Sequence, residues 1–199
     1  MKRHTAELKE KLIQTGVEEI KKHGIDKLSL RNVAKICGVT HGTPYKHFGS
    51  KEGYLRIIFE RLSHICSQEL QNDIIPTEPA RLQIAKMGYN FVTFAQAYPY
   101  IFEALFIKYP FNYLKIKDET VTADRDLPGF NDFKAIVLQL RQEESLAGSE
   151  AENLFHFWSF ISGFAILINS PVGDNFNQQT IRENIDSMLT TYIKGGKSS

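Results

Sequence analysis

The sequence predicts an all-α protein with two parts, a small N-terminal group of helices and a larger helical C-terminal part. Two observations carry this prediction: apolar residues recur at helical spacing along nearly the whole chain, and no segment alternates polar and apolar residues as a half-buried strand does. The 199 residues, 42% of them hydrophobic, suffice for one or two modest domains with a sizeable core.

The first forty residues predict two helices. Apolar residues at helical spacing define the first helix, and Gly24 is placed to end it at the C′ position. Ser29 is a good N-cap for a short second helix. The inward-facing residues of this second helix are expected to be Val33, Ala34 and either Ile36 or Cys37.

A tight turn joins the second helix to a very short third one. Gly38 can adopt the left-handed conformation that such a turn requires, and Val39 supplies an apolar anchor between the two helices. Thr40 is expected to cap the third helix, which ends near Phe48, and Ser50 to cap a long fourth helix.

The remainder of the chain predicts five further helices, separated by breaks that contain proline or glycine. Residues 109–129 are less regular, and two interpretations are open for them: partly helical or mobile. The expected helices cover residues 79–97, 99–108, 131–146 and 150–169, followed by a last helix that Asn177 caps.

Charge is distributed unevenly along the chain. Residues 1–50 hold ten Lys/Arg and five Asp/Glu, whereas residues 51–199 hold fourteen and eighteen. Four of the six histidines also lie in the first fifty residues. A basic N-terminal part on an acidic remainder favours a polyanion as the partner of the first part, although small charge differences are common among proteins.

The sequence also bears on the compartment. The N-terminus lacks the apolar segment of a signal peptide, and the longest apolar stretch, residues 155–168, is shorter than the roughly 20 residues that a membrane span needs. The two cysteines, Cys37 and Cys66, match no disulfide or metal framework. We therefore expect a cytoplasmic protein with no membrane partner.

The most informative segment is residues 28–51, which read LSLRNVAKICGVTHGTPYKHFGSK. The third helix buries little besides Phe48 and otherwise carries polar and aromatic side chains, so it needs a role other than filling a core. This pattern is typical of a helix-turn-helix that places a short helix in a DNA groove. Hydroxyls and backbone N–H groups at its start suit phosphate, and His41 is positioned to reach a base edge.

Nine residues form the predicted DNA-binding set. Several have a purely structural alternative, because Thr40 can act only as an N-cap and Tyr45 can pack on the first helix. His47 can be a turn residue, and Lys51 can be an ordinary solvated charge. Their joint arrangement favours DNA contact. The set is Ser29, Thr40, His41, Gly42, Thr43, Tyr45, Lys46, His47 and Lys51.

Residues 12–62 resemble the DNA-binding domain of the TetR family of bacterial transcriptional regulators. The matching positions are Gly24, Ser29, Ala34, Gly38-Val39-Thr40, Gly42-Thr43-Pro44-Tyr45-Lys46-His47-Phe48 and Ser50-Lys51-Glu52. The resemblance implies phosphate contacts for Thr40, Thr43, Tyr45, His47 and Lys51, and it places His41, Gly42 and Lys46 in the major groove. Gly53 departs from the family pattern, which has Asp, Glu or Ala at that position.

The same resemblance implies that two parts of the chain have different functions. Residues 1–50 would form the DNA-binding domain, a fourth helix would link from residue 51, and residues 51–199 would form the ligand-binding and dimerisation domain. The family precedent is a homodimer, which would place two recognition helices roughly 34 Å apart on a palindromic DNA operator. Residues 151–169 also resemble the WHG type of C-terminal domain, with Trp158 and Gly163 present but Ser162 in place of the family's histidine.

Seventeen of the 23 aromatic residues lie between Tyr89 and Phe164. They can form simply an aromatic core, or they can line a pocket for a flat, hydrophobic ligand. In TetR-like proteins this region usually binds a small-molecule effector. The pocket candidates are Tyr89, Phe94, Phe102, Phe106, Phe133 and Trp158.

The last two predicted helices are apolar on more than one face, so more than one face must be covered. Helices of a second subunit can cover the extra face. The candidates for a dimer interface are Phe157, Phe160, Ile161, Phe164, Ile168, Ile185, Met188, Leu189 and Tyr192.

No pattern in the sequence indicates an enzyme, a cofactor or a metal site. Glu152 and His156 lie four residues apart on one helix face, but no third ligand has diagnostic spacing, and an ordinary i,i+4 pair is expected. Neither a nucleophile motif nor a phosphate-binding glycine loop nor a pair of catalytic carboxylates stands out.

We therefore interpret the chain as a transcriptional repressor that a small hydrophobic or aromatic effector releases from its operator. Two alternatives stay open. A regulator controlled by a protein partner would have a closed, filled core in place of a ligand pocket. A small helical enzyme would need convergent nucleophile, base and acid groups around the aromatic cavity.

Overall fold

The computed structural model of the chain describes residues 2–109, 114–123 and 127–197. The chain divides into two compact units. We call Met1–Ser63 together with Tyr98–Pro110 the head, and His64–Ala97 together with Phe111–Ser199 the body. These two units are defined by how the chain packs, which does not test where the DNA-binding domain ends and the ligand-binding domain begins. The functional boundary expected near residue 50 therefore stays a prediction.

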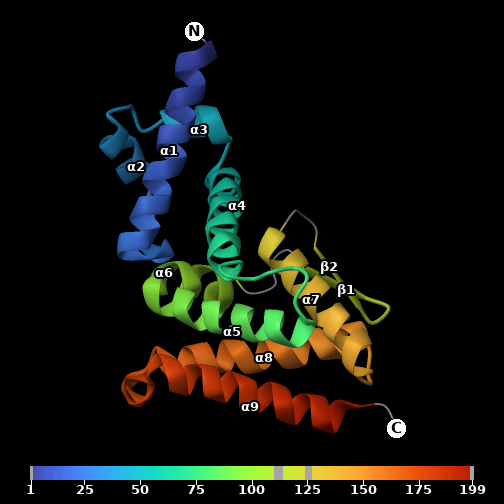
Figure 1. Ribbon diagram of the computed structural model, residues 1–199. Helices are drawn as coiled ribbons and strands as arrows, with labels where there is room; N and C mark the ends of the chain where they lie inside the picture. Colours follow the sequence, from blue (N-terminus) through green and yellow to red (C-terminus); the bar gives the residue numbers. More distant parts are fainter. Residues whose placement is uncertain (1, 110–113, 124–126, 198–199) are drawn as a thin grey trace. The chain divides into compact units, whose positions relative to one another are not determined.

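The head is built from helices (Figure 1). Helix α2 and the short helix α3 both pack on α1, and α6 also contacts α1. The segment expected as one helix over residues 99–108 begins as an α-helix and continues as a π-helix. The elements are α1 (Lys2–His23), the 3-10 turn η1 (Ile25–Lys27), α2 (Leu30–Cys37), α3 (Thr43–Phe48), most of α4 (Lys51–Leu70), α6 (Pro99–Phe102) and the π-helical η2 (Glu103–Lys108).

The core of the head is closed by a tyrosine from α4. Tyr54 is fully buried, and its hydroxyl donates a hydrogen bond of 2.7 Å to the carbonyl oxygen of Leu12 in α1. Gly16 makes room for the ring, since a Cβ at that position would lie 1.9 Å from the Tyr54 hydroxyl oxygen. Around this contact the fully buried apolar residues are Leu12, Val17, Ile20, Val33, Ile58 and Leu62.

Most of the predicted helix ends are confirmed. Gly24 and Gly38 follow α1 and α2 with left-handed φ values of 79° and 74°, and the Ser29 hydroxyl accepts the backbone N–H of Asn32. Ser50 accepts the backbone N–H of Gly53 at 3.0 Å at the start of α4. Of the two residues left open for the inward face of α2, the structure buries Cys37 and leaves Ile36 exposed.

The predicted capping role of Thr40 is wrong. Helix α3 begins at Thr43 and not directly after Thr40, because a turn at His41 and Gly42 comes first. Gly42 is the N-cap residue and makes no side-chain cap. The Thr40 hydroxyl instead lies 3.0 Å from the Thr43 hydroxyl, so these two side chains bind each other across the turn.

Gly53 departs from the family pattern for a steric reason. A Cβ at this position would lie 2.2 Å from the carbonyl oxygen of Phe48, which is too close for any side chain without a backbone shift. The chain therefore turns more tightly between α3 and α4 than an Asp, Glu or Ala at residue 53 would allow.

The body is a helical layer structure centred on α5. Helices α7, α8 and α9 all pack on α5, and Figure 1 shows α5, α8 and α9 running side by side. Capping boxes start two of them, Ser149 with Glu152 in α8 and Asn177 with Thr180 in α9. The elements are the end of α4, α5 (Ala80–Ala97), α7 (Pro128–Glu144), α8 (Glu150–Ile168), the 3-10 turn η3 (Pro171–Asn175) and α9 (Gln178–Gly196).

The body also contains a β-hairpin, and the expectation that the chain has no strand is wrong here. Strand β1 (Leu114–Lys117) pairs antiparallel with β2 (Thr120–Ala123), with Ile116 opposite Val121. Two residues in left-handed conformations, Asp118 and Glu119, make the turn between them. With four residues in each strand, the sheet is too small to change the class of the protein, and the predicted all-α fold is confirmed.

Helix α8 is the one helix within the described ranges that is long and apolar enough to cross a membrane. Its apolar window spans eighteen residues and is longer than the apolar stretch of residues 155–168. Core helices of globular proteins share this length and composition, and α8 buries residues such as Leu154 and Phe164 against its neighbours. Its composition is therefore weak evidence for a membrane span.

Candidate nucleic-acid interface

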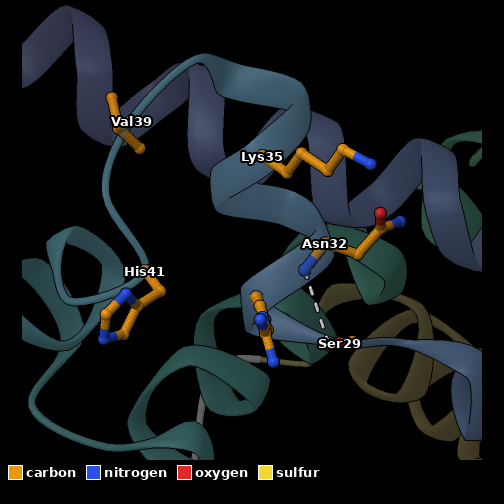
Figure 2. A pocket seen from close by; sticks show the side chains of 6 residues that line it. Ser29, Asn32, Lys35, Val39 and His41 are labelled. Carbon is orange, nitrogen blue, oxygen red and sulfur yellow. Dashed lines mark hydrogen bonds between the residues drawn. The ribbon is translucent and has the colours of Figure 1, made fainter.

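An open groove of about 550 Å³ lies beside the turn that joins α2 to α3 (Figure 2). One side of the groove is formed by α2 and the other by the residues of the turn. Figure 2 shows Asn32 and Lys35 on the helix, with Val39 and His41 on the segment that follows it. The lining residues are Ser29, Arg31, Asn32, Lys35, Val39 and His41.

The groove exists because α2 has two chemically different faces. Its buried face consists of Leu30, Val33, Ala34 and Cys37, which recur at the three- and four-residue spacing of an amphipathic helix. The remaining polar residues of the helix are exposed: Arg31, Asn32 and Lys35. Burying the apolar face against α1 therefore directs the polar face into the groove.

Helix α3 is anchored to the head by Pro44 and Phe48. Pro44 is buried in the first turn, and the Phe48 ring packs edge-on against Tyr54 with the ring centroids 4.9 Å apart. Tyr45, by contrast, is 49% exposed, so packing against the first helix does not account for most of its surface. The structure thus leaves most of this helix free to contact a partner.

The predicted DNA-binding residues gather at this one end of the head, on α2, α3, the turn between them and the start of α4. Six are exposed and three are half-buried, and the exposed Ser29 also lines the groove. Their individual contacts with DNA are not tested by this arrangement and stay predictions. The exposed ones are Ser29, Thr40, His41, Tyr45, Lys46 and Lys51; the half-buried ones are Gly42, Thr43 and His47.

Among the described residues, the basic side chains at this end of the head form no ion pair, although the Lys51 charge interacts with the neighbouring Glu52. Elsewhere in the head Arg61 pairs with Glu10 at 2.8 Å, Lys21 pairs with Glu18 at 3.4 Å, and Lys108 pairs with Asp26. Within the described residues, no ion pair engages the side chains of Arg31, Lys35, Lys46 or Lys51. Unpaired positive charge around an open groove is what an anionic polymer needs for binding.

One negative charge, on the Glu52 carboxylate, lies close to these basic residues. Hydrogen bonds from its own backbone N–H and from the Ser50 hydroxyl lower the pKa of the exposed Glu52 carboxyl. Glu52 therefore remains ionised at the N-terminus of α4, where a carboxylate interacts favourably with the helix dipole. The adjacent Lys51 extends from the same turn.

Sequence reasoning missed three residues of the groove. It concentrated on α3 and overlooked Arg31, Asn32 and Lys35 on the preceding helix. The four-residue spacing of Arg31 and Lys35, on the opposite face from Val33 and Cys37, was the available signal. Asn32 is anchored as well, because its side-chain amide donates a 2.7 Å hydrogen bond to Glu19 of α1.

The six predicted ligand-pocket residues do not fall in one unit. Phe102 and Phe106 belong to the head, where their ring centroids are 5.3 Å apart. The others belong to the body, where Phe133 packs edge-on against Trp158 at 5.9 Å. Of the last two, Tyr89 lies under the guanidinium of Arg182 and Phe94 is buried. Their role as a ligand pocket stays a prediction.

Most of the predicted dimer-interface residues already serve the core of the body. Five are buried within the chain and have little surface to offer a second subunit: Phe157, Phe164, Ile168, Ile185 and Leu189. Four are half-buried: Phe160, Ile161, Met188 and Tyr192. Two neighbours on α8 that the prediction omitted, Ile166 and Leu167, are 48% and 54% exposed.

Glu152 and His156 interact through charge, since His156 helps to lower the pKa of the Glu152 carboxyl after the hydrogen bonds from Ser149, but each side chain makes its hydrogen bond to another residue. The Glu152 carboxylate accepts the backbone N–H of Ser149 at 2.7 Å and closes the capping box of α8. His156 lies 3.0 Å from the Tyr192 hydroxyl instead. In the described part of the chain, no group of three His, Cys, Asp or Glu side chains is placed to hold a metal ion.

Comparison with known proteins gives a consistent picture of the N-terminal segment. Residues 12–56 match the family model described as bacterial regulatory proteins, tetR family. The uncharacterized HTH-type transcriptional regulator YvdT of Bacillus subtilis is 36% identical over 62 residues, or 31% of this chain. The match spans about a third, 32%, of that relative's own length.

Solved structures resemble the chain over nearly its whole length. A protein of unknown function from Rhodococcus sp. RHA1 superposes with a TM-score of 0.70 at 19% identity, covering 96% of both chains. A TetR-family transcriptional regulator from Haemophilus influenzae gives a TM-score of 0.62 at 20% identity, covering 94% of this chain and 96% of that one. At these identities the likeness shows a shared fold.

Proposed function

We propose that this chain, which belongs to the TetR family of bacterial transcriptional regulators, is a repressor that binds a palindromic operator as a homodimer and is released by a small effector. Of this function, DNA binding through the helix-turn-helix is the part that follows from membership of the family. The observation that supports the proposal best is the open groove beside the turn between α2 and α3, whose basic side chains form no ion pair within the described residues.

On DNA, the predicted contact residues of α3 and its flanks divide into two roles. Thr40, Thr43, Tyr45, His47 and Lys51 bind backbone phosphates through hydroxyls, a ring N–H and an ammonium group, with Ser29 beside them at the start of α2. His41, Gly42 and Lys46 enter the major groove. Phosphate contacts position the protein, and base-edge contacts specify the sequence. The missing side chain at Gly42 lets the backbone approach the DNA closely.

The dimer would form through the helices that close the body. Isolated apolar side chains on a surface need no explanation, but the adjacent Ile166 and Leu167 on α8 are both about half exposed. With the half-buried Phe160, Ile161 and Met188 they supply apolar surface for a second copy. A two-fold dimer repeats the helix-turn-helix, which accounts for the proposed palindromic operator with half-sites roughly 34 Å apart.

Release by a hydrophobic or aromatic effector is supported by the aromatic content of the body. A ligand that binds one arrangement of the dimer better than another shifts the population toward it. If that arrangement spaces the two recognition helices wrongly for the operator, affinity for DNA falls. Action on chromosomal DNA places the protein in the cytoplasm, and its two cysteines, both buried, form no disulfide in the structure.

The test begins with the full chain and a library of random duplex DNA. Repeated selection should enrich one palindromic sequence, and sedimentation should give a dimer on that DNA. A promoter carrying the sequence should then be repressed in cells that express the chain. Recovery of no preferred sequence would contradict the operator, and a monomer on DNA would contradict the dimer.

A second arm tests the effector. A panel of hydrophobic and aromatic small molecules is added to the protein bound to the selected DNA. We expect at least one compound to bind the protein and lower its operator affinity by tenfold or more. Compounds that bind tightly yet leave operator affinity unchanged would contradict release by an effector.

A further inference from the structure

The two edges of the β-hairpin in the body differ. Strand β2 lies against α7 and α8 (Figure 1), where the Val121 N–H donates to the Glu150 carboxylate at 3.0 Å and the Val121 carbonyl accepts from the Lys134 ammonium at 2.7 Å. Both backbone groups of Val121 therefore point away from β1. The hairpin is anchored through β2, and β1 is its outer strand.

The register of the hairpin fixes where the backbone of β1 points. Val121 is opposite Ile116, and the two residues of an antiparallel pair direct their N–H and C=O groups either at each other or both outward. Since the groups of Val121 point outward, those of Ile116 also point outward, on the far side of β1. We call this side the open edge, because no hydrogen bond reaches the Ile116 backbone in the described parts of the chain. An added strand would find a donor and an acceptor there.

The side chains of β1 divide between the two faces of the hairpin. Ile116 shares a face with Val121, but Val121 is 2% exposed and Ile116 is 62% exposed. The apolar face thus extends past the helices that cover Val121 and ends on an uncovered isoleucine. Lys115 and Lys117 project from the other face, and both are exposed. Among the described residues, the Lys117 ammonium pairs only with the neighbouring Asp118, at 4.0 Å and with both side chains 85% exposed.

The lysines of β1 disfavour a second copy of the chain at the open edge. If two β1 strands paired antiparallel with Ile116 facing Ile116, Lys115 and Lys117 would lie opposite each other twice. Like charges that are directly opposite destabilise a sheet. Lysines on edge strands prevent pairing between identical edges in this way. The occupant of this edge must therefore carry the opposite charge.

An acidic strand satisfies both faces of β1. Glutamate or aspartate opposite each lysine, with a β-branched residue opposite Ile116, makes every cross-strand pair favourable. We propose that the open edge of β1 binds an extended acidic segment of a partner protein, in which acidic and apolar residues alternate, by strand addition. Main-chain hydrogen bonds would supply affinity, and the alternating side chains would supply specificity. The proposed contact concerns the body alone, so it goes beyond DNA binding by the head.

The test uses the full chain and a short, end-capped, fluorescent peptide of alternating glutamate and valine. An anisotropy titration at low ionic strength should show saturable binding, and a peptide of alternating lysine and valine should bind at least about tenfold more weakly. Two methylated peptides test the backbone. N-methylation of the valines removes the N–H groups that would face Ile116 and should abolish binding. N-methylation of the glutamates alters only N–H groups that point away, so binding should persist.

Three variants of the chain test the same contact. Ile116→Pro removes the outward N–H without taking a hydrogen bond from the hairpin, and it should weaken peptide binding by about tenfold or more. The double change Lys115→Glu and Lys117→Glu should lose the glutamate peptide and gain the lysine peptide. Lys194→Glu, at an exposed lysine of α9, is the matched control and should bind as the wild type does. Urea unfolding of each variant checks that the body remains folded.

Three results would overturn the proposal. The first is a wild type that does not bind the glutamate peptide. The second is binding that Ile116→Pro and methylation of the valines leave unchanged, which would make the lysines an unspecific site for anions. The third is self-association of the chain in sedimentation that Ile116→Pro abolishes, which would place a second copy at this edge. Because selection of an operator by the head is measured separately, these results leave the proposed DNA binding intact.

Discussion

The groove of the head and the body use their charged side chains in opposite ways. In the body these groups bind each other and hold helices together: Lys134 pairs with Glu150 at 2.6 Å, Lys86 pairs with Glu78 at 2.6 Å, and the Arg182 guanidinium stacks on Tyr89. At the groove of the head, Arg31 and Lys35 have no such partner among the described residues. Positive charge that the fold itself does not use therefore lies where the family binds DNA.

The same contrast holds for aromatic side chains. Phe94 in α5 is 2% exposed, whereas Tyr45 in α3 is 49% exposed. One fills the core of the body and the other contributes little to the core of the head. Substitutions should therefore separate stability from DNA affinity, and the four predictions that follow run from the largest expected effect to the smallest.

The largest effect is expected from Phe94→Ala. Removing a fully buried ring leaves a cavity, and such changes cost about 3–5 kcal/mol of the free energy of unfolding. Urea denaturation followed by circular dichroism measures the loss. The matched variant is Tyr45→Ala, which removes an exposed ring and should change stability by no more than about 0.5 kcal/mol while weakening DNA binding. Equal losses of stability in the two variants would show that the two rings contribute equally to folding, contrary to the difference between the two units.

The second prediction concerns a buried amide in the body. Asn153 is 1% exposed, donates to the carbonyls of Ala147 and Ser149 at 2.9 Å each, and accepts from the Tyr192 hydroxyl at 2.9 Å. Asn153→Ala leaves these groups without their partner and should cost about 2–3 kcal/mol of the free energy of unfolding.

An exposed asparagine provides the control for Asn153→Ala. Asn184 in α9 donates only to the carbonyl of Thr180 in its own helix, at 2.8 Å. Asn184→Ala should stay within about 0.5 kcal/mol of the wild type in the same urea titration. A small effect at Asn153 would mean that the carbonyls find other partners and that this network does not hold α8 in place.

The sequence predicted the elements whose signals are local. Ser29, Gly38 and Asn177 end or begin helices through contacts within a few residues, so their roles could be inferred from residue type and spacing alone. The start of α3 was missed by two residues, since Gly42 and not Thr40 is its N-cap. The turn at His41 and Gly42 depends on a Thr40–Thr43 hydroxyl contact that competes with capping, and residue type does not decide between the two.

Other features depend on partners that are distant in sequence. The β-hairpin has only four residues in each strand, and the outer edge of β2 is completed by other elements: Glu150 accepts the Val121 N–H, and Lys134 donates to the Val121 carbonyl. In α8 nearly every position is apolar, so periodicity cannot separate the buried Phe157 from the exposed Leu167. Only packing distinguishes them.

The third prediction removes one unpaired charge from the head. Lys51→Ala should weaken DNA binding roughly tenfold at low salt, with a salt slope shallower by about 0.9, because one phosphate contact is lost. The measurement is a gel-shift or anisotropy titration at several salt concentrations. Unfolding should be unchanged, since Lys51 is exposed and lacks an ion pair within the described residues.

Lys134→Met gives the converse control for Lys51→Ala. It removes a lysine that pairs with Glu150 in the body, so it should lower stability and leave the salt slope of DNA binding at the wild-type value. If Lys51→Ala also leaves the slope unchanged, the absence of an acidic partner does not mark a phosphate contact.

The smallest effect is expected from Glu150, and it should depend on pH. Partial burial raises the pKa of this carboxyl, but hydrogen bonds from the Lys134 ammonium and the Val121 N–H, at 2.6 and 3.0 Å, outweigh it and hold the pKa below its ordinary value. In the unfolded chain the carboxyl takes up a proton at higher pH than in the folded protein. Its contribution to stability is therefore complete at neutral pH and is lost as the pH falls below about 4.3.

Comparison of the wild type with Glu150→Gln isolates this contribution. At pH 7 the variant should be less stable by about 1 kcal/mol, because the amide loses the charged partner of Lys134 but keeps an oxygen for the Val121 N–H. The difference in the free energy of unfolding should shrink as both proteins are titrated toward pH 3, because the wild-type carboxylate is then neutralised. A difference that stays constant over this range would show that the ion pair does not stabilise the packing of the hairpin on α7 and α8. Paired charges in the body would then contribute less to the free energy of unfolding than their geometry indicates.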